Sequence, residues 1–235
     1  MRRNADAQAK NEDAPTMPIT ADKGIELMPS PDQGSLAPSL VDEANRLLWK
    51  PGRPLKKQIN YACGLNVMPA WTNTDFFSAE SFPNGIVPEE VKDKVYHVDL
   101  AGQHPFPDNQ FAFAYCEDFI EHLDQKDLIT FLFEARRCLK RGGVLRMSTP
   151  GLQEAMYRHY YDKNFGDLEN EHYQCYTRWG HRCLYTHDSL RAIALGSGFS
   201  RYRERTFGIS THPALENIDT RSGQIELNII AELTK

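Results

Sequence analysis

Small and acidic side chains stand at the ends of four consecutive predicted strands. Gly64 follows the first strand, Asp75 the second, Asp99 the third, and Glu117 with Asp118 the fourth. In open α/β sheets, ligands bind outside the carboxyl ends of the strands, so we expect these groups to share one edge. That edge lacks the several glycines and the lysine of a phosphate site. It suits a nucleoside that carries positive charge.

Each of these groups has a distinct expected contact. A carboxylate after the second strand can accept hydrogen bonds from both ribose hydroxyls, and a polar group after the third can bind an adenine edge. Gly64 lets the backbone approach the ligand closely. A nicotinamide-dependent dehydrogenase is disfavoured, because it requires G-x-G-x-x-G at the start of a helix and an acid about 20 residues later. Here the acid comes sooner, and Pro69 interrupts any helix.

Residues 151–185 are polar and rich in aromatic rings, and we expect them to cover the substrate. Rings with polar tips suit a sugar or a planar metabolite. The same side chains can instead fill a flank of the sheet. The residues in question are Met156, Tyr157, His159, Tyr160, Tyr161, Phe165, Tyr173, Tyr176 and Trp179.

Five potential zinc ligands also lie close together in this part of the sequence. Their spacings do not match the paired short ligand loops of structural zinc sites, so we expect no metal site. The five residues are His172, Cys175, His181, Cys183 and His187.

The elements that position these groups alternate between strands and helices. Such alternation predicts an α/β sheet that is mostly parallel, with an antiparallel pair formed by the last two strands and helices on both faces. Helices are expected at 39–48, from Asp124 to the glycines at 142 and 143, and at 186–196. Strands are expected at 58–62, 72–76, 95–100, 111–115, 144–148, 201–207 and 224–233.

Composition is that of an ordinary globular domain with a sizeable core. The chain has 235 residues, of which 40% are hydrophobic and 25% charged. Residues 1–38 are rich in proline and poor in aromatic rings, so we expect a flexible tail, or a partial lid at 25–28. Residues 39–235 are expected to form a single domain.

Several classes of partner and location are disfavoured. No run of eighteen apolar residues and no secretory signal is present, so we expect no membrane contact. Five cysteines without framework spacing suit reduced thiols in a cytoplasm. The net charge of −5, without a basic stripe, argues against nucleic acid as the main partner.

Three motifs in order resemble the class I S-adenosylmethionine-dependent methyltransferases. The likeness is to a small branch whose first motif reads like GCG-N-x-x-P-G-W-x-N-x-D, here ACGLNVMPAWTNTD at 62–75. The second is DLAGQHPFPDNQFAFAYCEDFIEHL at 99–123, and the third is EARRCLKRGGVLRMSTP at 134–150. The resemblance implies a Rossmann-like fold and S-adenosyl-L-methionine as cofactor. Two positions depart from the pattern: Ala62 replaces a glycine, tolerable at negative φ, and Ala112 replaces an aspartate.

The resemblance also assigns cofactor contacts. Gly64 would lie under the methionine part, Asp75 would bind the ribose hydroxyls, and Asp99 with Leu100 would flank the adenine. The full expected cofactor-binding set is Tyr61, Ala62, Cys63, Gly64, Asn66, Asp75, Phe76, Asp99, Leu100 and Glu117.

Catalytic candidates lie at or just beyond the fourth strand, where the methyl group would point. His122 has an ordinary pKa suited to a general base, and Asp118 or Glu117 would act as base or substrate clamp. Alternatives stay open at each position. His122 can equally hydrogen-bond across the start of the next helix, Glu117 can bind only the cofactor, and Glu121 is expected to be a structural partner of a backbone N–H.

The function expected from these residues is methyl transfer to a small molecule, a sugar or natural-product metabolite, with O-methylation favoured over N-methylation. The alternative, motivated by Ala62 and Ala112, is a protein that binds S-adenosylmethionine without turnover.

Overall fold

The computed structural model describes residues 54–76, 94–161 and 163–235. The expected tail at 1–38, the helix at 39–48 and most of the loop after the second strand lie outside these ranges. No helix of the described ranges is long and apolar enough to cross a membrane.

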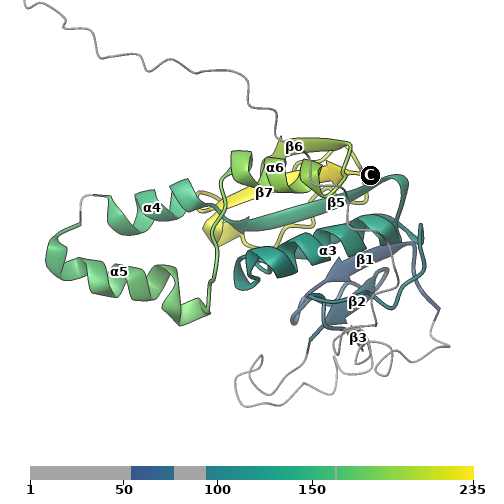
Figure 1. Ribbon diagram of the computed structural model, residues 1–235, viewed down its shortest axis with the longest axis horizontal. Coiled ribbons are helices and arrows are strands. Elements are labelled where there is room, and N and C mark those ends of the chain that lie inside the picture. The colour runs from purple at the N-terminus through teal and green to yellow at the C-terminus, as the bar shows by residue number, and fades with distance from the viewer. Residues whose placement is uncertain (1–53, 77–93, 162) are drawn as a thin grey trace, which may run out of the picture. The chain divides into compact units, whose positions relative to one another are not determined.

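Strands of the described chain form a seven-stranded sheet in the order β3-β2-β1-β4-β5-β7-β6 (Figure 1). Neighbours from β3 to β5 pair in parallel, and β7 runs antiparallel to both β5 and β6. The predicted α/β class, with its antiparallel C-terminal pair, is confirmed. The bounds are β1 Gln58–Tyr61, β2 Thr72–Asp75, β3 Val95–His97, β4 Phe111–Glu117, β5 Leu139–Pro150, β6 Arg201–Arg205 and β7 Asn228–Thr234.

Two helices begin at the capping residues that the sequence predicts. Before α3 (Gln125–Cys138), the Asp124 carboxylate accepts a hydrogen bond from the Asp127 backbone N–H at 2.9 Å. Before α6 (His187–Gly196), Thr186 and Ser189 form a reciprocal capping box. Each cap satisfies backbone donors that the first helical turn leaves free.

Element boundaries differ from prediction after α3 and near the C-terminus. The helix ends at Cys138 and not at the glycines, because Leu139 is already extended and begins β5 opposite Phe111. A side chain at Gly143 would meet the Lys140 carbonyl oxygen at 2.8 Å, so this tight approach requires glycine. The last strand starts at Asn228, after a 3-10 turn over Ser222–Gln224.

One face of the sheet carries the main core. Alternate residues of β1, β4 and β5, such as Tyr61, Cys116 and Met147, are buried in the same cluster as Phe131 of α3 and Leu190 of α6. Both helices therefore pack on this face. The alternation of period two along the strands and the apolar stripe of each helix explain why these residues meet.

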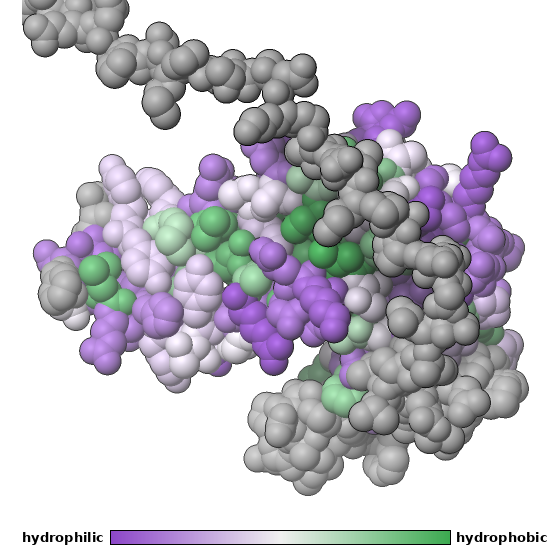
Figure 2. Space-filling view, viewed as in Figure 1, coloured by the Kyte–Doolittle hydropathy of each residue, from purple (hydrophilic) through white to green (hydrophobic). Residues whose placement is uncertain are grey.

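The segment at 151–185 contains α4 (Leu152–Tyr160), α5 (Leu168–Cys175) and a 3-10 turn over Thr177–Trp179. The two helices lie side by side beyond the end of β5 (Figure 1). In the space-filling view, apolar residues on this face form small patches among hydrophilic ones (Figure 2). The chain returns from these helices through 180–186 to α6.

Candidate functional site

A cavity of about 810 Å³ opens at the carboxyl ends of β1, β2 and β4. It gathers groups that are far apart in sequence, since parallel strands end at the same edge. All but one of the expected cofactor-binding residues line it: Ala62, Cys63, Gly64, Asn66, Asp75, Phe76, Asp99, Leu100 and Glu117.

Tyr61 is the exception. Its side chain is fully buried in the core, where the ring packs edge-on against Phe131 with centroids 5.3 Å apart. Because Cβ atoms alternate across a strand, Tyr61 points to the helix-covered face, whereas its neighbour Asn60 lines the cavity. Tyr61 therefore contributes to packing here and not to the cavity wall.

Gly64 and Asp75 form the floor of this cavity. The Gly64 N–H donates to Oδ2 of Asp75 at 2.5 Å, and the Phe76 N–H donates to Oδ1 at 2.7 Å. Burial raises the pKa of Asp75, and these two hydrogen bonds oppose the rise. Each carboxylate oxygen has a second lone pair, so Asp75 can accept further hydrogen bonds from a ligand.

The backbone around Gly64 leaves room for a ligand. A Cβ atom placed at Gly64 would meet no atom within 4 Å, so nothing in the described chain fills that space. The φ angle of Gly64 is +51°, in the left-handed region that favours glycine. Both the conformation and the open space fit a ligand that approaches the main chain here.

Ala62 adopts a strained conformation. The sequence interpretation relied on a negative φ at this position, but its φ is +48°. That expectation was wrong, because the chain must turn sharply between the end of β1 and Gly64. A non-glycine residue in the left-handed region costs about 1–3 kcal/mol, a cost that glycine at this position would avoid.

Glu117, at the end of β4, holds the long connection between β6 and β7. Its carboxylate accepts from the Thr220 N–H at 2.9 Å and from the Thr220 hydroxyl, and a longer bond of 3.4 Å comes from the Arg221 N–H. Both carboxylate oxygens are thus engaged by the loop. Thr220 and Arg221 in turn line the cavity.

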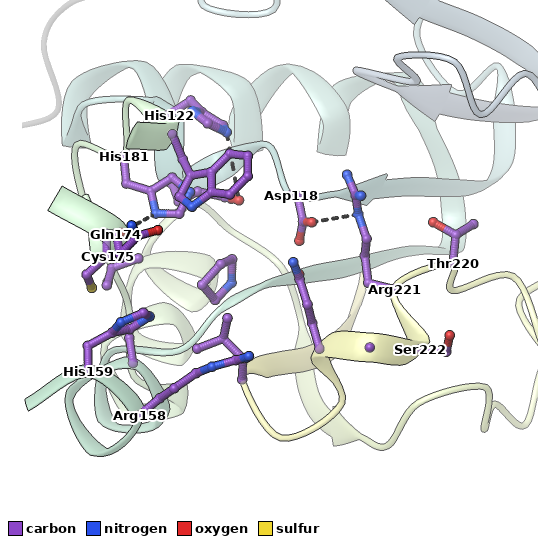
Figure 3. A pocket seen from close by; sticks show the side chains of 18 residues that line it. Asp118, His122, Arg158, His159, Gln174, Cys175, His181, Thr220, Arg221 and Ser222 are labelled. Atoms are coloured by element: carbon purple, nitrogen blue, oxygen red, sulfur yellow. Dashed lines mark hydrogen bonds and ion pairs between the residues drawn. The ribbon is translucent and has the colours of Figure 1, made fainter. Parts of the chain in front are cut away.

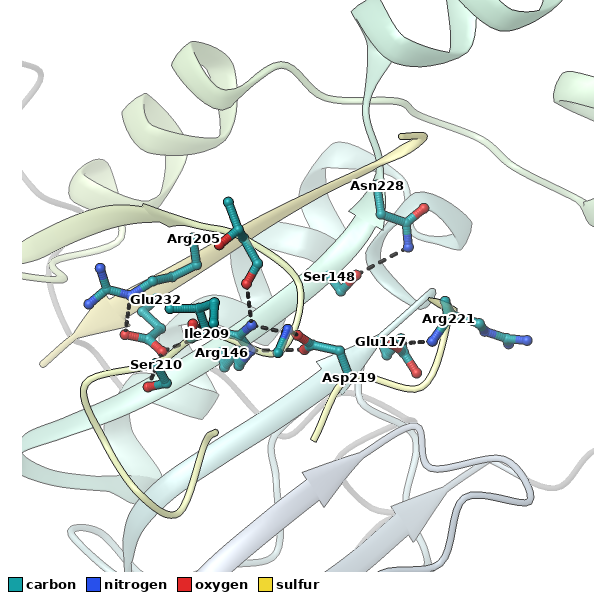
Figure 4. A network of polar contacts seen from close by, with 12 residues as sticks. Glu117, Arg146, Ser148, Arg205, Ile209, Ser210, Asp219, Arg221, Asn228 and Glu232 are labelled. Atoms are coloured by element: carbon teal, nitrogen blue, oxygen red, sulfur yellow. Dashed lines mark hydrogen bonds and ion pairs between the residues drawn. The ribbon is translucent and has the colours of Figure 1, made fainter. Parts of the chain in front are cut away.

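A buried arginine on β5 also binds the connection between β6 and β7 (Figure 4). Arg146 is fully buried, and its Nε donates to Oδ1 of Asp219 at 2.8 Å, while Nη1 lies 3.1 Å from Glu232 on β7. Its guanidinium also donates to the carbonyls of Thr206 and Ile209. These contacts satisfy the buried charge and fix the loop one residue before Thr220.

A second cavity of about 630 Å³ lies next to the first, between β5, α4 and the 3-10 turn near Trp179 (Figure 3). Both cavities are lined by the same five residues at their boundary. At this boundary Nε of Arg221 lies 2.8 Å from Oδ2 of Asp118. The shared residues are Asp118, His122, Trp179, Thr220 and Arg221.

Asp118 sits at the junction in an unusual conformation, with φ at +48°. Its Oδ1 accepts a hydrogen bond from the Asn228 side chain at 3.0 Å. Burial raises the pKa of Asp118, whereas the nearby Arg221 guanidinium lowers it. The carboxylate is therefore held in place from both sides, facing the boundary between the cavities.

Glu121 and His122, in the 3-10 turn Ile120–His122, differ sharply in exposure. The Glu121 side chain is fully buried, and its Oε2 accepts a hydrogen bond from the Thr149 hydroxyl at 2.8 Å. Burial, reinforced by the charge of Asp118, raises the pKa of Glu121 to about 8. The His122 side chain is 40% exposed, and burial lowers its pKa. Both residues line the second cavity.

The aromatic segment contributes less to the cavities than expected. Of its members, His159 and Trp179 line the second cavity. Tyr157 and Tyr161 are exposed and stack on each other with centroids 4.9 Å apart. Of the five potential zinc ligands, His187 contacts the Tyr202 hydroxyl at 2.8 Å, whereas Nδ1 of His181 lies 2.8 Å from the Cys175 carbonyl oxygen. All five cysteines are free thiols.

Sequence reasoning missed two residues of the site, Thr220 and Arg221. It named a third, Glu121, but only as a structural residue. Thr220 and Arg221 lie about a hundred residues from Glu117 in an irregular loop, so no periodic pattern pointed to them. Glu121 was expected to be a structural partner of a backbone N–H, and its side chain also accepts a hydrogen bond from the Thr149 hydroxyl. Its position three residues after Asp118 places it near the strand-end acids but does not show that its side chain faces a cavity.

Comparison with known proteins gives one family match. The model of a methyltransferase domain matches residues 80–147, which include β4, α3 and most of β5. No curated protein matches the chain.

Solved structures with a similar fold include three S-adenosylmethionine-dependent methyltransferases. One from Thermotoga maritima has 16% identity and a TM-score of 0.49, and the match covers 78% of the present chain and 84% of the Thermotoga chain. One from Mesorhizobium loti has 15% identity and a TM-score of 0.48, and the match covers 82% of the present chain and 96% of the Mesorhizobium chain. One from Archaeoglobus fulgidus has 13% identity and a TM-score of 0.48, and the match covers 77% of the present chain and 86% of the Archaeoglobus chain.

Proposed function

We propose that this chain, whose residues 80–147 match a methyltransferase domain, is a class I S-adenosylmethionine-dependent methyltransferase that methylates a small hydroxylated molecule bound in the second cavity. The observation that carries this proposal is the shared boundary of the two cavities. A donor held in the first cavity and an acceptor held in the second would meet beside Asp118 and His122.

Residues of the first cavity fit the cofactor. Asp75 has free lone pairs for the ribose hydroxyls, and Gly64 leaves an open backbone surface for the methionine part. Asp99 and Leu100 line the same wall, beyond the end of β3, and would flank the adenine. When bound, S-adenosylmethionine supplies a methyl group on a positively charged sulfur, and the carbon–sulfur bond breaks with its electron pair onto sulfur.

The second cavity offers polar groups of both signs for an acceptor. Arg158, His159 and Gln174 line it from α4 and α5, opposite Asp118 and Arg221 (Figure 3). A volume of about 630 Å³ is in the range of ligand pockets for small metabolites. A sugar or a natural-product metabolite presents hydroxyl groups that such side chains can orient, and orientation supplies much of the rate in transfers of this kind.

An oxygen acceptor must lose its proton as the new carbon–oxygen bond forms. His122 lines both cavities, and its lowered pKa leaves it neutral at pH 7 and able to take that proton. We assign Asp118 as the clamp beside it, because its carboxylate is fixed by Arg221 and Asn228. Glu117 positions the loop that carries Arg221, since both its oxygens are engaged there.

Methyl transfer can be tested with S-adenosylmethionine labelled in its methyl group. The full chain would be incubated with a panel of hydroxylated sugars and phenols and, in parallel, of amines. We expect label to appear in a hydroxylated acceptor, and a His122→Gln variant to transfer it about 10²–10⁴-fold more slowly at neutral pH. Transfer only to amines would contradict the O-directed proposal.

The alternative function is cofactor binding without turnover, which the strained Ala62 still motivates. Calorimetry with S-adenosylhomocysteine in the same experiment separates the two. Binding without transfer to any member of the panel would support the alternative, whereas binding with transfer supports the enzyme.

A further inference from the structure

Glu121 has an unused carboxylate oxygen at the wall of the second cavity. Its side chain is fully buried, yet Oε1 has no hydrogen-bond partner among the described residues. An unpaired buried carboxylate oxygen is costly unless a cation or a donor satisfies it. Thr149 satisfies only the other oxygen, Oε2. The arrangement therefore calls for a further partner on the Oε1 side.

Two imidazole rings stand on that side. Nε2 of His122 lies 3.9 Å from Oε1 of Glu121, and the rings of His122 and His181 have centroids 5.2 Å apart. One ligand atom from each of the three residues lies within 4.8 Å of the others. Figure 3 shows the two histidines close together on one side of the cavity.

A backbone contact orients the ring of His181 as histidine ligands are commonly oriented in metal sites. Nδ1 of His181 lies 2.8 Å from the carbonyl oxygen of Cys175, to which it can donate, leaving Nε2 with a lone pair. Histidines that bind metals commonly donate their second N–H to a backbone carbonyl in this way. Nε2 is the ring nitrogen of His122 that lies on the Glu121 side, 3.9 Å from Oε1.

We propose that Glu121, His122 and His181 form a binding site for a divalent transition metal of the zinc type at the wall of the acceptor cavity. Two imidazole nitrogens and one carboxylate are a donor set that zinc accepts in catalytic sites, with a fourth position left open. Ligand atoms about 2.0–2.2 Å from one zinc ion lie about 3–3.5 Å apart. The ligand atoms now lie within 4.8 Å of one another, so binding would draw them closer together.

The open position of such a site faces the cavity that both Glu121 and His181 line. A metal there would bind the acceptor oxygen and lower the pKa of its hydroxyl, as bound zinc does for water. With the metal bound, the proton would leave to water and His122 would act as a ligand; in the metal-free protein, His122 takes the proton as proposed above. This role rests on the proposed methyl transfer, whereas the binding site itself rests only on the three side chains.

Zinc binding can be measured on the full chain after chelator treatment and dialysis. Titration with Zn²⁺ in a calorimeter is expected to show one ion per chain. Glu121→Gln keeps the shape of the side chain, and we expect it to weaken zinc binding at least tenfold. His181→Ala, at a half-buried position, is expected to do the same. His172→Ala removes an exposed histidine of the same segment and should bind zinc as the wild type does.

Cobalt provides a second measurement that identifies the ligands. Co²⁺ bound by imidazole and carboxylate should give visible bands without the charge-transfer absorption of a thiolate, which excludes the five free cysteines as ligands. No stoichiometric zinc in the wild type, a thiolate signal, or unchanged affinity in Glu121→Gln would each overturn the proposal.

Affinity for S-adenosylhomocysteine separates this inference from the proposed function. Glu121 and His181 do not line the cofactor cavity, so both variants should keep that affinity, which also reports that they are folded. Zinc binding without nucleoside binding would contradict the methyltransferase proposal alone. Nucleoside binding without zinc would contradict only the metal site.

Discussion

Nε of Arg221 lies 2.8 Å from Oδ2 of Asp118, and this ion pair stands where the two cavities meet. The two residues come from distant parts of the chain, the end of β4 and the loop before β7. Their contact lies between the first cavity and the second. The loop that carries Arg221 is therefore part of the site and not merely a connection between strands.

Replacing Arg221 by methionine should impair the reaction without affecting the fold. The side chain is 53% exposed, so the ion pair contributes at most about 1 kcal/mol to stability. Asp118 would lose its partner at the junction, and we expect kcat/KM for the acceptor to fall at least tenfold. Arg203→Met, on the exposed side of β6, is the matched control. Equal kcat/KM in Arg221→Met and wild type would show that the pair plays no part in the reaction.

Arg146→Met should destabilise the protein by about 3–5 kcal/mol in urea unfolding. The substitution leaves Asp219 and Glu232 as buried carboxylates without their shared cation. Arg146→Lys should also destabilise, since an ammonium cannot make the forked contacts of the guanidinium. Arg203→Met again serves as control and should change stability by less than about 0.5 kcal/mol. A loss of under 1 kcal/mol in Arg146→Met would contradict the anchoring role.

His104 should make stability depend on pH in the mildly acidic range. Burial lowers the pKa of this fully buried histidine to about 4, with a smaller lowering from Arg137 and opposite effects from Glu134 and the Leu100 carbonyl. The unfolded chain, with the ordinary value of 6.5, binds a proton first as pH falls, so stability decreases through this window. The loss is about 2 kcal/mol between pH 6.5 and about 4.5.

The contribution of His104 can be isolated by comparing urea unfolding of the wild type and His104→Gln at several pH values. The variant cannot titrate at this position, so its stability should fall less steeply as pH decreases from 6.5. Parallel curves for the two proteins would mean that His104 does not remain neutral in the folded state.

Ala62→Gly should stabilise the chain by about 0.5–1 kcal/mol. Relief of the left-handed backbone strain at Ala62 is worth more than the added flexibility of glycine in the unfolded state. Ala70 is the control, because it is exposed in the same loop but does not have a positive φ. Ala70→Gly should therefore destabilise. If both substitutions lower the urea midpoint, the strain at Ala62 is not significant.

Much of the fold and of the first cavity was predictable because local patterns determine them. Alternation of strands and helices gave the sheet class, and the side chains of Asp124 and Thr186 marked two helix starts. Asp75 and Glu117 could be placed at one edge because parallel strands end together. The end of α3 was misjudged, since the glycines that usually stop a helix here belong to the beginning of β5.

The second cavity was less predictable because it depends on long-range contacts. Arg221 reaches Asp118 only because Arg146, Asp219 and Glu117 hold an irregular loop, and none of these contacts leaves a periodic signal. The unused oxygen of Glu121 is likewise a property of three-dimensional burial. Its sequence neighbours gave no sign that the side chain would face a cavity together with His181.

The central claim is that Asp75 and Gly64 hold the nucleoside of the cofactor at the carboxyl edge of the sheet. Calorimetric titration of S-adenosylhomocysteine into wild type and Asp75→Ala tests it most directly, with Asp188→Ala on the exposed start of α6 as control. We expect binding of one molecule per chain, weakened at least tenfold, or about 1.4 kcal/mol, in Asp75→Ala alone. Equal affinity in Asp75→Ala and wild type would place the nucleoside elsewhere and contradict the account.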